Sequence, residues 1–313
     1  MPIWTDADRG RRRYDASVKL LTDLDHRPLI VAAVTPLTDD GSAVDEGSVA
    51  PYVAFLESNG ADGVFACGTT GEGILLSLDE RRRTVEAFRS AVSGALIVHA
   101  GAQSTVDTCA LAAHATEIGA DAVAVIPPPY FALDADALTA HFVAAARAAA
   151  PLPFYCYAFT ARSGYALPVG VIKRVADAVD NLAGLKVSES PFERVEPYLE
   201  LGLPVLIGSE PLIRAGIARG ALGTVSGMAS AFPDVVRAAL DVADEPATAR
   251  LSELRAALEA SGQFIAAAKH VLGMRGTSVG QGMRAPLRRL AAAEETALEQ
   301  SVAAFLSPVP AGC

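Results

Sequence analysis

The amino-acid sequence predicts an α/β fold, a (β/α)8 TIM barrel followed by a C-terminal helical appendage. Eight short apolar runs alternate with Ala-rich stretches of helical periodicity over about 200 residues, and this alternation stops after residue 232. Near-continuous apolar strands separated by helices are typical of a parallel sheet covered on its outer side, and eight such units match a closed barrel. A doubly wound open sheet is the competing interpretation, but the GxGxxG fingerprint of many such sheets is absent.

The expected strands begin 18 to 33 residues apart, which leaves room for one helix and two loops between neighbours. They cover residues 29–35, 62–67, 95–101, 121–127, 152–157, 182–187, 203–209 and 221–227. Helices are expected at 232–243, 246–272 and 284–305, with a Gly-rich break at 273–284. We therefore divide the chain into an N-terminal extension (1–26), the barrel (27–245) and a C-terminal helical region (246–313).

Composition restricts the class of protein. The chain of 313 residues is 51% hydrophobic with a mean hydropathy of +0.31, so it has enough apolar residues for a large core. Its net charge of −10 argues against a nucleic-acid partner. No apolar stretch approaches the roughly 18 residues of a membrane span, and the first residues lack the apolar segment of a signal peptide. We expect a cytoplasmic protein with no membrane partner.

The metal-binding residue types show no ligand spacing. The four cysteines form no CxxC pair, and the five histidines form neither HxH nor HExxH. We therefore expect reduced thiols, no metal and no other cofactor. His99 lies in an expected strand, and we interpret it as a core histidine.

Lys186 is the strongest candidate for chemistry. The chain has 22 arginines but four lysines, and only Lys186 lies inside an apolar strand. Lys173 and Lys269 fall in helical stretches, where solvated lysines are common. A buried ammonium is costly, so such a lysine tends to lose its proton and becomes the nucleophile that forms a Schiff base with a ketone. The alternative is a structural lysine paired with one nearby carboxylate, from Glu189 or Glu210.

Tyr157 ends the strand that precedes the Lys186 strand. In a TIM barrel the active site lies at the C-terminal ends of the strands, so this phenol is expected beside Lys186. There it could relay protons during imine formation. The alternative is an aromatic residue that fills the core.

Two further features suit the binding of carboxylates. The segment Gly68-Thr69-Thr70-Gly71 follows the second strand and offers backbone N–H groups, two hydroxyls and small residues that permit close approach. A simple turn before a helix explains this segment equally well. Arg162 follows the fifth strand and could hold a second carboxylate in a bidentate fashion, or it could be an ordinary surface charge.

Several motifs in order resemble one family, from about residue 28 to residue 290. They are Val34-Thr35-Pro36, Asp45, Gly68-Thr69-Thr70-Gly71-Glu72, Pro129-Tyr130-Phe131, Tyr157, Gly184-Leu185-Lys186, Gly223-Thr224-Val225-Ser226 and Arg284-Ala285-Pro286-Leu287. In this pattern the chain resembles the dihydrodipicolinate synthase / N-acetylneuraminate lyase family, the pyruvate-dependent class I Schiff-base aldolases.

The resemblance implies a role for each matching residue. Lys186 would form the imine with pyruvate or another 2-keto acid, and Tyr157 would relay protons with Thr69 as its hydrogen-bond partner. Thr70 would bind the pyruvate carboxylate, and the backbone carbonyl of Val225 would line the pocket. Tyr130 would reach across a tight dimer interface into the active site of the neighbouring subunit. The protein would then be a homodimer or homotetramer whose second substrate is a small aldehyde.

The chain departs from the lysine-pathway synthases at two places. Their Asn-Val-Pro after the tyrosine is replaced by residues 158–160, Ala-Phe-Thr, although Arg162, which helps to hold aspartate semialdehyde in those synthases, is retained. The histidines that help to bind feedback lysine in some synthases are replaced by Leu78 and Arg81. We expect a synthase-like enzyme that free lysine does not inhibit. A 2-keto-3-deoxy sugar acid or 4-hydroxy-2-oxoglutarate aldolase is the alternative, and a non-catalytic keto-acid-binding barrel is a third hypothesis.

Overall fold

The computed structural model confirms the predicted barrel. It describes Leu21, residues 24–242 and residues 245–306, so most of the expected N-terminal extension and the last seven residues lie outside the described part. Eight parallel strands close on themselves in sequence order, with β1 paired to β8. The strands are β1 Leu29–Ala32, β2 Gly63–Ala66, β3 Ala95–His99, β4 Ala122–Val125, β5 Phe154–Ala158, β6 Leu182–Val187, β7 Val205–Ile207 and β8 Gly223–Ser226.

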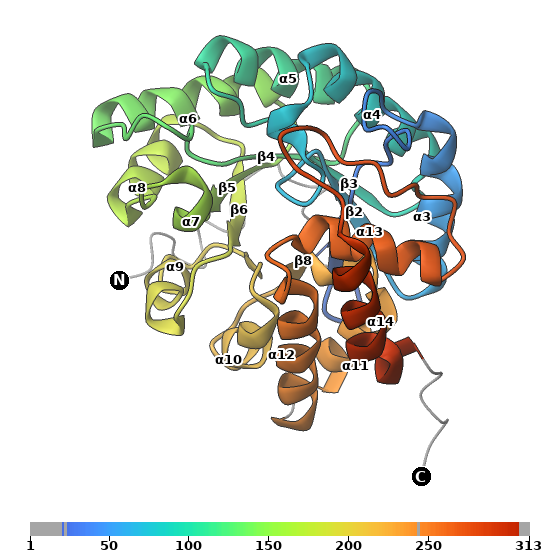
Figure 1. The fold of residues 1–313 in the computed structure, drawn as a ribbon. Helices are drawn as coiled ribbons and strands as arrows, with labels where there is room; N and C mark the ends of the chain where they lie inside the picture. Colours follow the sequence, from blue (N-terminus) through green and yellow to red (C-terminus); the bar gives the residue numbers. More distant parts are fainter. Residues whose placement is uncertain (1–20, 22–23, 243–244, 307–313) are drawn as a thin grey trace.

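Helices cover the outer face of the barrel (Figure 1). Three of them begin where the sequence supplies a cap, because the side chains of Ser77, Ser104 and Asp134 accept hydrogen bonds from backbone N–H groups of the first turn. The helices around the barrel are α3 Val49–Ser58, α4 Leu78–Ala91, α5 Thr105–Glu117, α6 Ala135–Ala149, α7 Thr160–Ser163, α8 Val169–Ala178, α9 Glu196–Leu199, α10 Ile213–Ala218 and α11 Pro233–Val242.

The C-terminal region is helical, but its helices end at other residues than predicted. The single helix expected over 246–272 is two helices, α12 Glu245–Glu259 and α13 Phe264–Met274, separated by a turn in which Gly262 has a φ of 68°. The last helix, α14 Ala292–Leu306, begins eight residues later than the predicted 284. In this appendage α12 packs against α11, α13 and α14. None of the described helices is long and apolar enough to cross a membrane.

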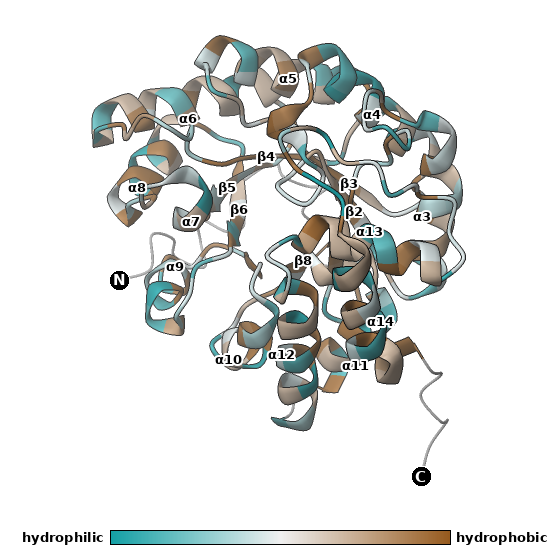
Figure 2. Cartoon of the chain, in the orientation of Figure 1, coloured by the Kyte–Doolittle hydropathy of each residue, from teal (hydrophilic) through white to brown (hydrophobic). Residues whose placement is uncertain are grey.

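Two hydrophobic clusters lie on the two sides of the sheet. The larger joins the outward faces of the strands to the helices, and Figure 2 shows the hydrophilic residues mostly on the outer faces of those helices. The smaller fills the barrel with alanines and a few large residues, including Phe65, Tyr155 and Tyr157. Gly184 makes room for one of these rings, since a Cβ at this position would lie 2.7 Å from the Tyr155 ring. Small residues thus let aromatic rings and Lys186 occupy the barrel interior.

Candidate active site

Lys186 lies in β6 and points into the barrel interior, only 4% exposed. Its Nζ lies 3.8 Å from the centroid of the Phe65 ring and 4.2 Å from that of Tyr157. Its side chain makes no hydrogen bond or ion pair with any residue that the structure describes. Burial lowers the pKa of Lys186 to about 7, although the negative charge of Glu210 opposes this effect. A large fraction of this amine is therefore neutral near pH 7, while the two rings favour the charged form.

Neither carboxylate that could have paired with Lys186 does so. Glu189 accepts hydrogen bonds from the backbone N–H and the hydroxyl of Thr160, at 2.7 and 2.9 Å. Glu210 is fully buried and accepts from the Ser226 hydroxyl at 2.7 Å and from the Arg255 guanidinium. Both carboxylates are thus held by other partners, and the interpretation of Lys186 as one half of a structural ion pair is wrong.

Tyr157 lies directly beside Lys186, because the two residues are partners in the β5–β6 register. Burial raises the pKa of the Tyr157 phenol to about 12, while hydrogen bonds with the side chains of Ser188 and Thr69 act in the opposite direction. The phenol therefore keeps its proton at neutral pH. The predicted contact between Tyr157 and Thr69 is present, at the mouth of the barrel.

The segment after β2, residues 68–72, is named here the threonine loop. It leaves the strand through Cys67, which has a φ of 56°, and ends at Glu72, with a φ of 55°. Side chains other than glycine rarely adopt this left-handed conformation, so surrounding contacts must hold it. The Thr35 hydroxyl donates to the carbonyl oxygen of Gly71 at 2.6 Å. Gly73 follows so closely against Cys67 that a Cβ would lie 1.9 Å from the Cys67 oxygen.

A buried ion pair ties the threonine loop to the C-terminal region. Lys269 donates from its Nζ to Glu72 at 2.6 Å and to the carbonyl oxygen of Gly282 at 2.7 Å, and both charged side chains are fully buried. The second oxygen of Glu72 accepts from the backbone N–H of Arg284 at 2.8 Å. The expectation that Lys269 is a solvated helix lysine is wrong, because α13 turns this face toward the barrel mouth.

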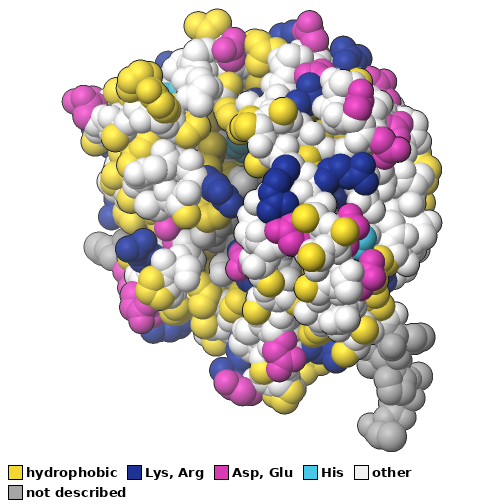
Figure 3. Space-filling model, in the orientation of Figure 1, with side chains coloured by type: hydrophobic (Ala, Val, Ile, Leu, Met, Phe, Trp, Pro, Cys, Tyr) yellow, Lys and Arg dark blue, Asp and Glu magenta, His cyan; other side chains and the backbone are white. Residues whose placement is uncertain are grey.

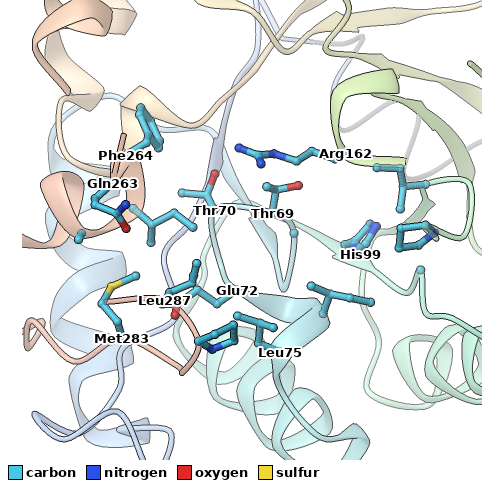
Figure 4. Close-up of a pocket in the computed structure, with 18 of the residues that line it drawn as sticks. Thr69, Thr70, Glu72, Leu75, His99, Arg162, Gln263, Phe264, Met283 and Leu287 are labelled. Carbon is cyan, nitrogen blue, oxygen red and sulfur yellow. The ribbon is translucent and has the colours of Figure 1, made fainter. Parts of the chain in front are cut away.

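A cavity of about 390 Å³ opens above the threonine loop. Its lining includes Thr69, Thr70 and Arg162, and Figure 4 shows their side chains together in the upper middle of the view. The Arg162 guanidinium makes no ion pair with a described residue and is exposed. It lies 5.8 Å from the centroid of the Phe159 ring. Figure 3 shows basic side chains around a hollow at the centre of this face. The arrangement can bind a carboxylate beside a reactive amine.

His99 also lines this cavity. The expectation of a core histidine whose hydrogen bonds are all satisfied is therefore wrong. Its Nδ1 lies 3.1 Å from the Cys67 carbonyl oxygen, and because that oxygen can only accept, Nδ1 carries the proton. Its Nε2 is buried without a partner among the described residues. Burial and the charges of Arg81 and Lys186 lower the pKa of His99 to about 3, so the ring is neutral. Its position at the end of β3 was the signal that could have identified it.

Arg81 lies in α4 on the face that packs against the end of β3, and its side chain does not face solvent. It is buried, and its guanidinium donates to the carbonyl oxygens of His99 and Gly101. In this position it supports the end of β3. The described residues contain no group of three or more His, Cys, Asp or Glu arranged to hold a metal ion.

Lys186 and Tyr157 are buried in the barrel interior and are not among the residues that line this cavity, and neither are the remaining two candidates, Val225 and Tyr130. Val225 lies in β8, buried in the same interior cluster as Tyr157. Tyr130 is 85% exposed, has a φ of 83° and stacks edge-on against the exposed Phe131, with ring centroids 4.8 Å apart. Both rings are exposed on a loop at the rim of the site, and Tyr130 therefore lies outside the cluster around Lys186.

The chain matches known proteins over most of its length. The model of the Dihydrodipicolinate synthetase family matches residues 25–305. The chain belongs to this family. An uncharacterised DapA-like lyase of Halobacterium salinarum is 36% identical over 287 residues, which cover 88% of this chain and 92% of the relative. A 4-hydroxy-tetrahydrodipicolinate synthase of Alkalilimnicola ehrlichii is 37% identical over 243 residues, or 73% of this chain and 82% of that enzyme.

Solved structures agree with the membership in the dihydrodipicolinate synthetase family. The N-acetylneuraminate lyase of Proteus mirabilis superposes with a TM-score of 0.81 at 28% identity, covering 90% of this chain and 98% of that one. The relatives thus include both a synthase and a sialic-acid lyase, so membership alone leaves the second substrate open.

Proposed function

We propose that this protein is a pyruvate-dependent class I lyase that joins a 2-keto acid and an aldehyde, or separates them, through a Schiff base on Lys186. The observation that carries the proposal is the environment of Lys186. Its amine is buried, has no carboxylate partner among the described residues, has a pKa lowered to about 7 and lies against the Tyr157 ring. A neutral amine of this kind is the nucleophile that imine formation requires.

The steps follow from the two side chains. The Lys186 nitrogen bonds to C2 of pyruvate, and the carbonyl oxygen takes up a proton to give a carbinolamine. Tyr157, whose phenol is protonated at neutral pH, donates its proton to the departing hydroxyl, which leaves as water. The resulting iminium loses a C3 proton to the Tyr157 phenolate and becomes an enamine. C3 then attacks the aldehyde carbon, the aldehyde oxygen receives the proton from Tyr157, and water releases the product from the lysine.

The other residues bind and position the substrate in this proposal. Thr69 holds the Tyr157 hydroxyl in the direction of the reacting oxygen, and Thr70 with the backbone N–H groups of the threonine loop binds the pyruvate carboxylate. Arg162 supplies the unpaired positive charge at the cavity and orients an acidic oxygen of the substrate. In this proposal the backbone carbonyl of Val225 lines the pocket around Lys186 that receives pyruvate. No metal or cofactor is needed, since the lysine itself activates the ketone.

We also propose that the working unit is at least a dimer, a homodimer or homotetramer. The exposed pair of rings at Tyr130 and Phe131 supports this, because two large apolar side chains at one rim are commonly covered by a partner. In such a dimer Tyr130 reaches the neighbouring site and joins its tyrosine relay.

Borohydride trapping tests the proposed chemistry directly. With pyruvate present, reduction should add one covalent adduct per chain, seen by intact mass and located on Lys186 by peptide mapping. Lys186→Ala should abolish the adduct, while Lys173→Ala, which removes an exposed lysine, should leave it unchanged. Labelling that persists in Lys186→Ala, or that a chelator prevents, would contradict the proposal. An adduct without turnover of any aldehyde would favour a non-catalytic keto-acid-binding barrel instead.

A further inference from the structure

The cavity above the threonine loop has two unlike sides. Thr69, Thr70, Arg162 and His99 lie on one side. The other side is named here the apolar wall and consists of Leu75, Phe264, Met283, Pro286 and Leu287. Figure 4 shows Phe264, Met283 and Leu287 across the threonines from Arg162 and His99. The polar side adjoins Lys186 through Tyr157, which hydrogen-bonds to Thr69 and whose ring centroid lies 6.0 Å from that of His99. A molecule bound to Lys186 would therefore enter the cavity at the polar side and extend its far end toward the apolar wall.

The apolar wall is held in place before any substrate arrives. Leu75 ends the short 3-10 helix Gly73–Leu75, which follows directly on Glu72. Met283 lies between Gly282 and Arg284, whose backbone groups bond to the Glu72–Lys269 ion pair. Phe264 begins α13, the helix that carries Lys269. One buried ion pair thus fixes the three segments of the wall, and a preformed pocket selects its ligand by the groups it presents.

The apolar wall offers no partner for a charged or polyhydroxylated chain. Glu72 lines the cavity, but Lys269 and the backbone N–H of Arg284 already occupy its two oxygens. Glu72 therefore has no uncompensated negative charge with which to bind an ammonium group such as that of aspartate semialdehyde. Gln263 is the one other polar side chain beside the wall among the described lining residues. The several hydroxyls of a sugar aldehyde would find few protein partners there, so the wall offers them no gain over water, whereas an apolar group gains by leaving water.

We infer that the aldehyde partner carries an apolar body, a branched alkyl chain or an aromatic ring, which packs against the apolar wall while its carbonyl faces Lys186. This inference rests on the proposed Schiff-base function and names the class of its second substrate. The cavity of about 390 Å³ is in the size range of small-ligand pockets, so pyruvate and a ring can share it. Aspartate semialdehyde and sugar aldehydes are then poor substrates.

The test is a panel of aldehydes with the wild-type enzyme and saturating pyruvate. Benzaldehyde and 3-methylbutanal represent the apolar class, erythrose and glyceraldehyde the hydroxylated class, and aspartate semialdehyde the charged class. We expect kcat/KM for the better apolar aldehyde to exceed that for every other aldehyde by at least about tenfold, the usual selectivity of an apolar pocket. A kcat/KM for erythrose, glyceraldehyde or aspartate semialdehyde that lies within about tenfold of that for the better apolar aldehyde, or above it, would overturn the inference without requiring any variant.

A matched pair of variants ties the preference to the wall. Leu287→Gln places an amide on the apolar wall at a half-buried position and should reduce the ratio of kcat/KM for benzaldehyde to that for erythrose about tenfold. Leu199→Gln makes the same change at a half-buried leucine of α9, away from the cavity lining, and should leave the ratio unchanged. A ratio that falls equally in both variants, or in neither, would contradict the assignment of the wall.

Borohydride trapping without aldehyde distinguishes failure of the apolar substrate class from failure of the Schiff-base function. A pyruvate adduct on Lys186, together with a preference for erythrose or aspartate semialdehyde, overturns the apolar substrate class and leaves the Schiff-base function standing. Absence of the adduct overturns the Schiff-base function, and the inference about its second substrate fails with it.

Discussion

Replacing Lys186 with methionine should make the protein more stable while it abolishes the pyruvate adduct. The physical reason is that the folded state keeps an unpaired amine in the barrel interior, 4% exposed, and lowers its pKa from 10.5 to about 7. Methionine retains an unbranched apolar stem but has no charge to remove from water. A residue kept for its reactivity at the expense of stability is expected at a catalytic position.

The magnitude follows from linkage between protonation and folding. At pH 7.5 an unfolded lysine is almost fully charged, whereas the folded one is about three-quarters neutral, and this shift costs roughly 4 kcal/mol of the free energy of unfolding. Because the folded pKa is the lower one, the unfolded state binds more protons between about pH 7 and 10.5. Wild-type stability relative to Lys186→Met therefore rises with pH through this window, and the cost is greatest below pH 7. Allowing for imperfect packing, we expect Lys186→Met to gain roughly 2–4 kcal/mol at pH 7.5.

The assay is denaturant unfolding of both proteins at one protein concentration, at pH 6.5, 7.5 and 9.5. Lys173→Met is the control, because it removes the same charge from an exposed position of α8 and should change the free energy of unfolding little. If Lys186→Met is no more stable than wild type at pH 7.5, the amine is not desolvated in the folded state and the reasoning fails. If the difference does not shrink toward pH 9.5, the cause is packing rather than protonation.

Four further outcomes are expected. Tyr157→Phe should keep the far-UV circular dichroism spectrum but slow turnover by roughly 10²–10⁴, the range for a positioned acid–base group, and near wild-type rates would make Tyr157 a packing residue. Sedimentation should show a dimer or tetramer that Tyr130→Ala weakens, whereas a fully active monomer at low concentration would remove Tyr130 from the site. Lys269→Met should cost about 3–5 kcal/mol in unfolding, because it strands the buried Glu72 carboxylate, and Lys269→Met combined with Glu72→Gln should recover part of the loss. If the double variant recovers nothing, the cost is not that of a stranded charge. Free lysine should not inhibit the initial rate at saturating pyruvate, because residue 81 is an arginine whose guanidinium is already bound to backbone carbonyls, and half-inhibition below 1 mM lysine would refute this expectation.

The barrel was predictable from sequence because its signal is local. Each strand is a short apolar run, and all eight predicted runs overlap the observed strands. Most strands of the structure are shorter than predicted, since several predicted runs include residues that lie in the loops after them, among them Cys67, Gly101 and Gly208, whereas β6 has the predicted bounds. Lys186 and Tyr157 were identifiable for the same reason, as polar residues at the C-terminal ends of apolar strands.

The ends of the C-terminal helices were not predictable in the same way. The helical pattern continues through residues 260–263 with Gly262 as the one interruption, and a single glycine is tolerated within many helices. The chain turns there because it places Phe264 at the cavity and Lys269 against Glu72. The reason for the break is therefore a contact across the fold, which a local pattern does not contain.

The two buried lysines show why the partner, rather than the flanking sequence, decides what a lysine does. Lys269 lies in an Ala-rich helix and is as buried as Lys186, yet its Nζ meets a carboxylate 197 positions away in sequence, with a carbonyl oxygen beside it. A charge so bound has no free lone pair with which to attack a ketone. Lys186 meets two aromatic rings and no free carboxylate among the described residues, so its amine can exist as the neutral nucleophile. Pyruvate and borohydride should therefore label Lys186 and leave the buried Lys269 unlabelled. An adduct on Lys269 would contradict the argument that its carboxylate partner prevents the reaction.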